Sequence, residues 1–240
     1  MTSLNELQNF PVVSKNQFQV STAFRWILAG PSGSGKTQFV KHAKKNPDLF
    51  KKGPFNKIYY FTRIPQSELK DLDPSIEIYD TLPSEEEFEQ LATPFKGEKN
   101  EKGEFTTSGS LFVLDDFGQN LTKSLASIFQ ILSRHLNASV FLILQCLFSS
   151  NPLYRELSLN STQITIFRNI RDKQQIKIFA RQICEGDCNW IKELFSNLCK
   201  YPYTYLHFDL SQECPDNLRI RTNIFKHEGP TKIFTERKQS

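Results

Sequence analysis

The sequence has little of what marks secreted or membrane proteins. Its five cysteines are an odd number without the regular spacing of a disulfide scaffold, so we expect a reducing, intracellular setting. Cys184 and Cys188 lie near each other, but no second Cys or His pair follows at the spacing of a zinc site. The longest apolar run, around residues 140–148, is too short to span a bilayer, and the N-terminal residues lack a signal-peptide pattern. These absences predict a soluble protein with no membrane partner.

No charge of one sign dominates the chain, and no linker or repeat divides it. The formal net charge of +4 permits a nucleic-acid partner without demonstrating one. The 240 residues suit one sizeable domain with its own core. We expect an N-terminal arm over residues 1–22, a nucleotide-binding domain over 23–225 and a C-terminal tail over 226–240.

An apolar segment runs directly into a glycine-rich loop at residues 25–37. The loop fits the pattern G-x-x-x-x-G-K-[ST], whose backbone N–H groups cradle phosphates at the start of a helix. In this pattern Lys36 reaches the phosphates as a catalytic group, and the Thr37 hydroxyl ligates Mg²⁺. The predicted nucleotide-binding residues are Gly30, Ser32, Gly33, Ser34, Gly35, Lys36, Thr37 and Gln38.

Buried strands and helices alternate along the rest of the chain. Strands are expected at 24–29, 57–61, 76–79, 111–114, 139–144 and 163–167, and helices at 36–45, 84–91, 122–136, 172–183 and 187–198. A loop should fill 94–108, a polar segment 152–155, and a closing hairpin or edge pair 203–210 and 218–222. This alternation predicts an α/β P-loop NTPase with a mostly parallel sheet flanked by helices on both faces.

Polar residues end two of the apolar strands. Asp115 and Asp116 follow one strand and Gln145 ends the next, so all three should emerge beside the phosphate loop. Asp115 is expected to hold Mg²⁺, Asp116 to activate the attacking water, and Gln145 to sense phosphate or position that water. Residues 115–118 also match the D-x-x-G motif of GTPases and the D-F-G motif of protein kinases. The sequence lacks the other motifs that accompany these two in GTPases and protein kinases.

An arginine often neutralises charge on the transferred phosphoryl group, in the same subunit or from a neighbour. Arg134 is our first candidate, with Arg168 and Arg171 as alternatives, while an ordinary surface ion pair also accounts for any one of them.

Several segments together resemble the genome-packaging ATPases of the FtsK/HerA superfamily. They are GPSGSGKT, SLFVLDDF, SRHLNASVFLILQCLF and IFRNIRDKQQI, and the resemblance extends over about residues 24–225. The sequence is most similar to the packaging ATPases of Maverick/Polinton transposable elements and more distantly to poxvirus-type packaging ATPases.

The resemblance implies a RecA/FtsK-like fold that uses ATP and Mg²⁺ to drive double-stranded DNA into a capsid. It also implies a homo-oligomeric ring, expected to be a hexamer, with capsid proteins as partners, in the host nucleus or at a cytoplasmic virus-assembly site. By position, Lys36 and Thr37 are the Walker A pair, Asp115 and Asp116 the Walker B acids, and Gln145 the polar sensor.

Two other functions remain open on the sequence. One is a nucleotide or nucleoside kinase, in which residues 168–171 serve as a lid, and the other is a nucleotide-binding scaffold without turnover. Hydrolysis of ATP that is stimulated by DNA separates all three functions.

Overall fold

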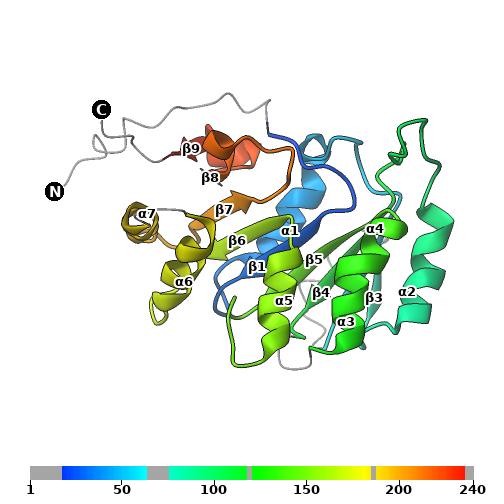
Figure 1. The fold of residues 1–240 in the computed structure, drawn as a ribbon, viewed down its shortest axis with the longest axis horizontal. Coiled ribbons are helices and arrows are strands. Elements are labelled where there is room, and N and C mark those ends of the chain that lie inside the picture. Colours follow the sequence, from blue (N-terminus) through cyan, green and yellow to red (C-terminus); the bar gives the residue numbers. More distant parts are fainter. Residues whose placement is uncertain (1–17, 64–75, 118–120, 185–187, 236–240) are drawn as a thin grey trace.

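The computed structural model describes residues 18–63, 76–117, 121–184 and 188–235. In this part of the chain all strands join one nine-stranded sheet in the order β3-β2-β4-β5-β1-β6-β7-β8-β9 (Figure 1). Strands β3 to β6 of this order run parallel, and β7, β8 and β9 are antiparallel to their neighbours. The strands are β1 (Arg25–Ala29), β2 (Lys57–Thr62), β3 (Ile76–Tyr79), β4 (Ser110–Asp115), β5 (Ala138–Leu144), β6 (Gln163–Phe167), β7 (Tyr205–Asp209), β8 (Ile220–Thr222) and β9 (Lys232–Phe234).

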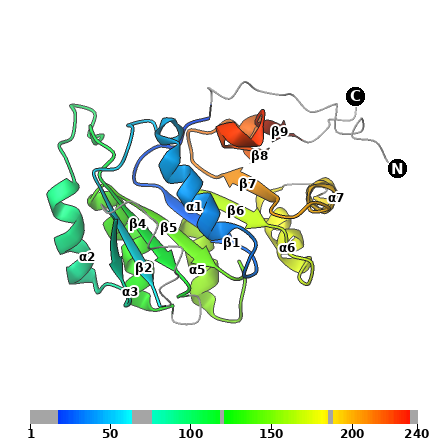
Figure 2. The ribbon, with the colours of Figure 1, turned by 180° about the vertical axis from the view of Figure 1, so that it is seen from behind.

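Helices cover both faces of the sheet. Helix α1 lies on one face and the other α-helices on the opposite face, as the two views from front and back show (Figures 1 and 2). The α-helices are α1 (Lys36–Lys45), α2 (Glu85–Ala92), α3 (Lys123–Ser127), α4 (Ser133–His135), α5 (Pro152–Asn160), α6 (Gln174–Ile183) and α7 (Asn189–Leu198). Shorter helical segments are η3 (Pro47–Leu49), η5 (Thr93–Phe95), η7 (Ile128–Leu132), η8 (Asp216–Leu218) and η9 (Lys226–Glu228). The predicted fold class is thus confirmed.

Each face of the sheet has its own apolar core. Alternate residues of β1 divide between the two, because Trp26 and Leu28 pack with α1 whereas Ile27 and Ala29 pack toward α3 and α5. Strands β4 and β5 are buried along their whole length, as a parallel sheet covered on both sides requires.

The expected helix at 122–136 forms with a break in its regularity. Its residues divide into α3, the π-helical segment η7 and α4, which follow one another without interruption. Thr122 caps its start by accepting a hydrogen bond from the Leu125 N–H (3.1 Å).

One α-helix and one strand were not predicted. Residues 152–155, expected as a polar segment, begin helix α5, whose first residue is Pro152 and whose capping Asn151 accepts from the Leu153 N–H (3.0 Å). Strand β9 (Lys232–Phe234) extends the sheet beyond β8, and it lies within the tail expected over residues 226–240. The expected pair of closing strands is present as β7 and β8, but β9 rather than β8 is the edge.

Part of the expected N-terminal arm is packed on the domain. Phe18 and Val20 are buried, and Val20 exchanges backbone hydrogen bonds with Leu49 and Lys51. The rest of the arm lies outside the described residues. The expected loop at 94–108 contains η5 and a β-bridge between Lys99 and Phe105.

Polar side chains are buried where β1, β6 and β7 adjoin. The Thr165 hydroxyl accepts from Trp26 Nε1 (2.9 Å) and lies 3.0 Å from His207 Nδ1. His207 is fully buried, and burial lowers the pKa of its imidazole well below the ordinary value, so the ring is neutral.

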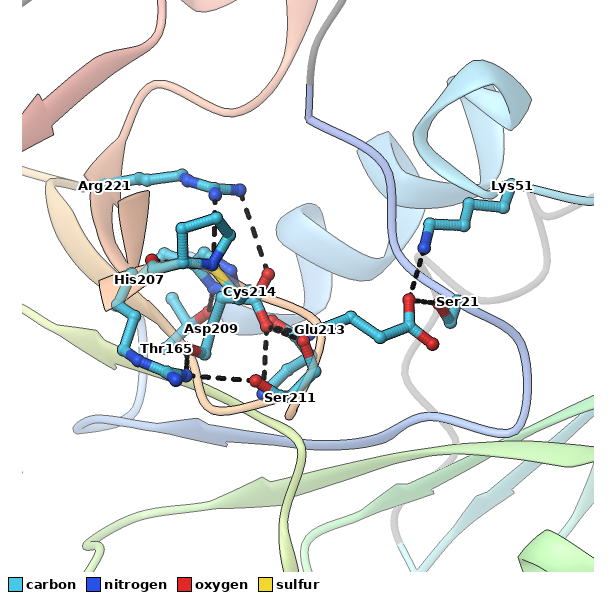
Figure 3. A network of polar contacts seen from close by, with 12 residues as sticks. Ser21, Lys51, Thr165, His207, Asp209, Ser211, Glu213, Cys214 and Arg221 are labelled. Atoms are coloured by element: carbon cyan, nitrogen blue, oxygen red, sulfur yellow. Dashed lines mark hydrogen bonds and ion pairs between the residues drawn. The ribbon is translucent and has the colours of Figure 1, made fainter. Parts of the chain in front are cut away.

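This polar cluster extends to β8 and the N-terminal segment (Figure 3). Asp209 accepts from Gln163 Nε2 (2.9 Å) and lies 3.9 Å from the guanidinium of Arg221. Arg221 also contacts Cys214 and lies over the ring of Phe18. The cluster therefore ties the antiparallel strands to the parallel part of the sheet.

Candidate functional site

A cleft of about 860 Å³ opens at the carboxyl ends of the central parallel strands. Its lining comes from the phosphate loop and α1, from the residues that follow β4 and β5, and from segments near the C-terminus. The lining residues include Ser32, Gly33, Gly35, Lys36, Thr37, Gln38, His42, Asp115, Asp116, Gln145, Tyr203, Tyr205, Phe225, His227 and Glu228. In an open α/β sheet, ligands bind at this edge.

Close packing fixes the start of the phosphate loop. The Gly30 N–H donates to the Leu144 carbonyl at the end of the neighbouring β5 (3.1 Å). A Cβ atom on Gly30 would lie only 2.7 Å from Cβ of Phe167 in β6, so glycine is required for this approach. Gly30 therefore anchors the loop from behind the cleft rather than lining it.

The N-terminus of α1 is open to an anion. Gly35 is its N-cap in a left-handed conformation (φ 103°), no side chain caps the helix, and its first turn has no acidic residue. The first amides of a helix lack intrahelical partners and carry partial positive charge. Ser34 is a buried residue of the loop, and among the described atoms its hydroxyl has no hydrogen-bond partner. These features fit the phosphates of a nucleotide.

Lys36 is buried inside the loop. Its Nζ donates to the carbonyl oxygens of Gly30 (2.6 Å) and Pro31 (2.8 Å). Burial lowers the pKa of Lys36 to about 8, while the nearby Asp115 and Asp116 act in the opposite direction. The amine is thus held beside both acids at the floor of the cleft.

Asp115 ends β4 opposite Thr62 of β2. The Tyr60 hydroxyl donates to Asp115 Oδ2 (2.6 Å). Burial raises the pKa of Asp115, and the Tyr60 hydrogen bond and Lys36 partly offset this. Sequence reasoning missed Tyr60, because its partnership with Asp115 depends on the pairing of β2 with β4.

Asp116 and Gln145 face each other across the ends of β4 and β5. Asp116 has a left-handed backbone (φ 65°), which is uncommon for a residue with a side chain and is found at functional turns. Gln145 Nε2 lies 3.4 Å from Asp116 Oδ1 and donates to it. An acid and an amide held together at the cleft suit the positioning of a water molecule.

The predicted arginine lies away from this cleft. Arg134 is in α4, which leads into the first residue of β5, and Ala138 there pairs with Ser110 at the start of β4. Arg134 is therefore at the amino edge of the sheet, whereas Asp115 is at the carboxyl edge. Arg168 and Arg171 follow β6 at the carboxyl edge but do not line the cleft.

The structure adds a set of lining residues from far along the chain. Tyr203, Tyr205, Phe225, His227 and Glu228 complete the cleft beside His42 of α1. No local motif marks these residues, because they meet α1 only through tertiary packing. Tyr205 and Phe225 pack against Phe39, and His227 packs against His42.

No helix among the described residues is long and apolar enough to cross a membrane. No curated protein sequence matches the chain.

Solved structures match the fold. The DNA-packaging ATPase B204 of Sulfolobus turreted icosahedral virus is similar over 85% of this chain and 98% of its own, with 16% identity and a TM-score of 0.55. The genome-packaging NTPase B204 of Sulfolobus turreted icosahedral virus 2, in complex with AMPPCP, is similar over 83% of this chain and 96% of its own, with 14% identity and a TM-score of 0.50.

The family model described as Poxvirus A32 protein matches residues 14–152, more than half of the chain. That stretch contains the phosphate loop, both acids and Gln145, which the structure brings to one cleft. The chain belongs to the Poxvirus A32 protein family.

Proposed function

We propose that this protein is an ATPase that drives DNA packaging in a virus or virus-like element. The observation that carries the proposal is that Lys36, Thr37, Asp115, Asp116 and Gln145 all line one cleft. Family membership and the fold shared with B204, itself described as a DNA-packaging ATPase, support the same function.

The residues divide into three roles. The loop amides and Lys36 bind the phosphates of ATP, and Thr37 and Asp115 hold Mg²⁺ through oxygen ligands, which this ion prefers. Bound Mg²⁺ supplies positive charge that neutralises the phosphate oxygens. Asp116 accepts a proton from the attacking water, and Gln145 orients that water.

Tyr60 positions Asp115 in this scheme. Because its hydroxyl donates to Oδ2, one carboxylate oxygen is held in a fixed direction. A ligand oriented by a second hydrogen bond in this way is a common feature of metal sites.

We further propose that the protein works as a homo-oligomeric ring on double-stranded DNA at a capsid, with Arg134 reaching the cleft of a neighbouring subunit. The position of Arg134 at the amino edge supports action between subunits, because the length of strands β4 and β5 separates Arg134 from the cleft of its own subunit. A hexamer and the closer relation to Maverick/Polinton elements are expectations from the sequence resemblance alone.

The alternatives make different demands. A nucleotide kinase needs a small phosphate acceptor and does not respond to DNA, and a scaffold binds nucleotide without turnover. The acid and amide pair of Asp116 and Gln145, placed beside the phosphate loop, favours hydrolysis.

Phosphate release from ATP, with and without linear duplex DNA, tests the proposal. We expect hydrolysis that rises with DNA and steepens with protein concentration. Lys36→Ala and Asp116→Asn should each reduce it at least about 100-fold, the scale of a lost catalytic group. Turnover that ignores DNA, or that requires a small phosphate acceptor, would contradict the proposal and favour a kinase.

A further inference from the structure

The cleft continues well beyond the groups that bind phosphate. It follows α1 from Lys36 to His42, a rise of about 9 Å for six helical residues, and both residues line it. That length is on the scale of the ribose and base of a nucleotide. We call the part lined by His42, Tyr203, Phe225 and His227 the aromatic end of the cleft.

Tyr203 is an exposed aromatic side chain on an unusual backbone. It is 71% exposed and has a left-handed conformation (φ 60°), which is an outlier for a bulky residue. Its Cδ1 is 3.7 Å from the position of a Cβ on Gly35, so the ring lies beside the phosphate loop.

Hydrogen bonds hold the turn that carries Tyr203. The Thr204 hydroxyl donates to the Tyr201 carbonyl (2.8 Å), and the Thr204 carbonyl accepts from the Arg168 N–H (2.9 Å). The exposed ring is therefore carried by a turn that hydrogen bonds hold in place.

The rings of His42, Phe225 and His227 form the far wall. The centroids of His42 and His227 are 4.1 Å apart, and His227 is nearly parallel to Phe225 (12°). Glu228 fixes this wall, because its carboxylate accepts from the Tyr205 hydroxyl (2.5 Å) and the Phe225 N–H (3.0 Å).

We propose that the aromatic end of the cleft binds the base of a purine nucleotide, with Tyr203 as the ring on which the base stacks. Flat π surfaces beside a phosphate site suit a base, and the two-ring purine covers more of them than a pyrimidine does. The inference rests on the proposed function only in that the cleft takes a nucleoside triphosphate.

Equilibrium binding to the full chain, without DNA, tests this site. The probes are ATP, CTP and inorganic tripolyphosphate, which has no base. Tyr203→Gly removes the ring and suits the left-handed backbone, Tyr203→Phe keeps the ring, and Tyr201→Ala removes a neighbouring exposed tyrosine that does not line the cleft.

We expect wild-type protein to bind ATP more tightly than CTP. Tyr203→Gly should weaken ATP binding about tenfold, which is within the range of one lost base stack. The ratio of ATP affinity to CTP affinity should therefore become smaller in this variant. Tripolyphosphate binding should stay within about twofold, and Tyr203→Phe and Tyr201→Ala should resemble wild type.

The site assignment is overturned if Tyr203→Gly leaves ATP binding unchanged, or weakens tripolyphosphate as much as ATP. Either result would contradict the base site without contradicting the proposed DNA-dependent ATPase activity. A wild-type chain that binds neither ATP nor tripolyphosphate would instead contradict the proposed function itself.

Discussion

At the scale of single residues, the position of the phosphate loop depends on the missing side chain of Gly30. Gly30 has no side chain, and this allows β6 to approach through Phe167. The loop backbone at Gly30 then supplies the carbonyl to which Lys36 donates. One missing Cβ thus connects the packing of the sheet to the position of the Lys36 amine.

Gly30→Ala should lower the free energy of unfolding by about 1–3 kcal/mol, the usual cost of overpacking a core. The new Cβ would meet Cβ of Phe167, which the strand backbone holds in place. Urea unfolding measures the loss, and nucleotide binding should weaken with it because the loop is displaced.

Gly103→Ala is the matched control for this change. Gly103 has nothing within 4 Å of the added Cβ but has a positive φ of 76°, so the control carries backbone strain without a contact. Its effect on nucleotide binding should be negligible. Equal loss of binding in both variants would show that the contact with Phe167 is not the cause.

At the scale of elements, the antiparallel strands β7 and β8 are attached to the parallel sheet through buried polar groups. His207 and Asp209 lie on β7 and Arg221 on β8, and they contact side chains of β6 and the N-terminal segment. This attachment positions the segments that carry Tyr203 and His227 beside α1.

The attachment should be sensitive to acid. The buried His207 has a pKa far below its ordinary value of 6.5, since burial disfavours the charged ring. The unfolded chain therefore takes up a proton that the folded chain does not as the pH falls below 6.5. The free energy of unfolding should decrease by about 1.5 kcal/mol between pH 6.5 and 5 from this group alone.

Urea unfolding at several pH values measures this decrease, with His207→Gln as the variant. The variant should lose stability less steeply over the same interval, whereas His135→Gln, which changes an exposed histidine, should follow wild type. Parallel pH curves for wild type and His207→Gln would argue against the buried neutral ring.

Most helices and strands of the parallel part of the fold could be predicted from the sequence, because their signals are local. The apolar runs of β4 and β5 and the capping box of α2, where Ser84 and Glu87 bond reciprocally, are read within a few residues. Helix α5 stands where a polar segment is expected at residues 152–155, and Pro152 suits its first helical position.

The rest of the site could not be predicted, because it depends on pairing between distant segments. Tyr60 reaches Asp115 through the register of β2 and β4. His42 meets His227 only once the C-terminal segment has folded over α1. Neither contact has a counterpart in the spacing of residues along the chain.

At the scale of the whole molecule, the cleft and Arg134 lie at opposite ends of the parallel strands. The cleft lies at the carboxyl edge, and Arg134 lies near Arg25 at the amino edge. Burial lowers the pKa of Arg25, and the positive charge of Arg134 lowers it further. In a head-to-tail ring, unlike surfaces of neighbouring subunits meet, so one edge can complete the other.

Mixing two inactive variants tests this arrangement. Arg134→Ala retains the cleft and Lys36→Ala retains the arginine, so we expect mixed rings to regain part of the DNA-dependent ATP hydrolysis that each variant lacks alone. Phosphate release measured at a constant total protein concentration checks this. Arg171→Ala serves as the matched control, and it should hydrolyse ATP in the presence of DNA without a second variant being added.

Absence of recovery, with both variants shown to assemble, would exclude Arg134 as a group acting between subunits. Full activity of Arg134→Ala alone would assign the arginine to surface solvation.

The aromatic end of the cleft is assembled from distant parts of the chain, because His42 lies close in sequence to the phosphate loop whereas the other rings come from the C-terminal part. The stretch matched by the Poxvirus A32 model ends at residue 152, whereas Tyr203, Phe225 and His227 all lie beyond it. Changes at these three positions would therefore alter the aromatic end of the cleft and leave every residue of the matched stretch, including the phosphate loop and both acids, as it is.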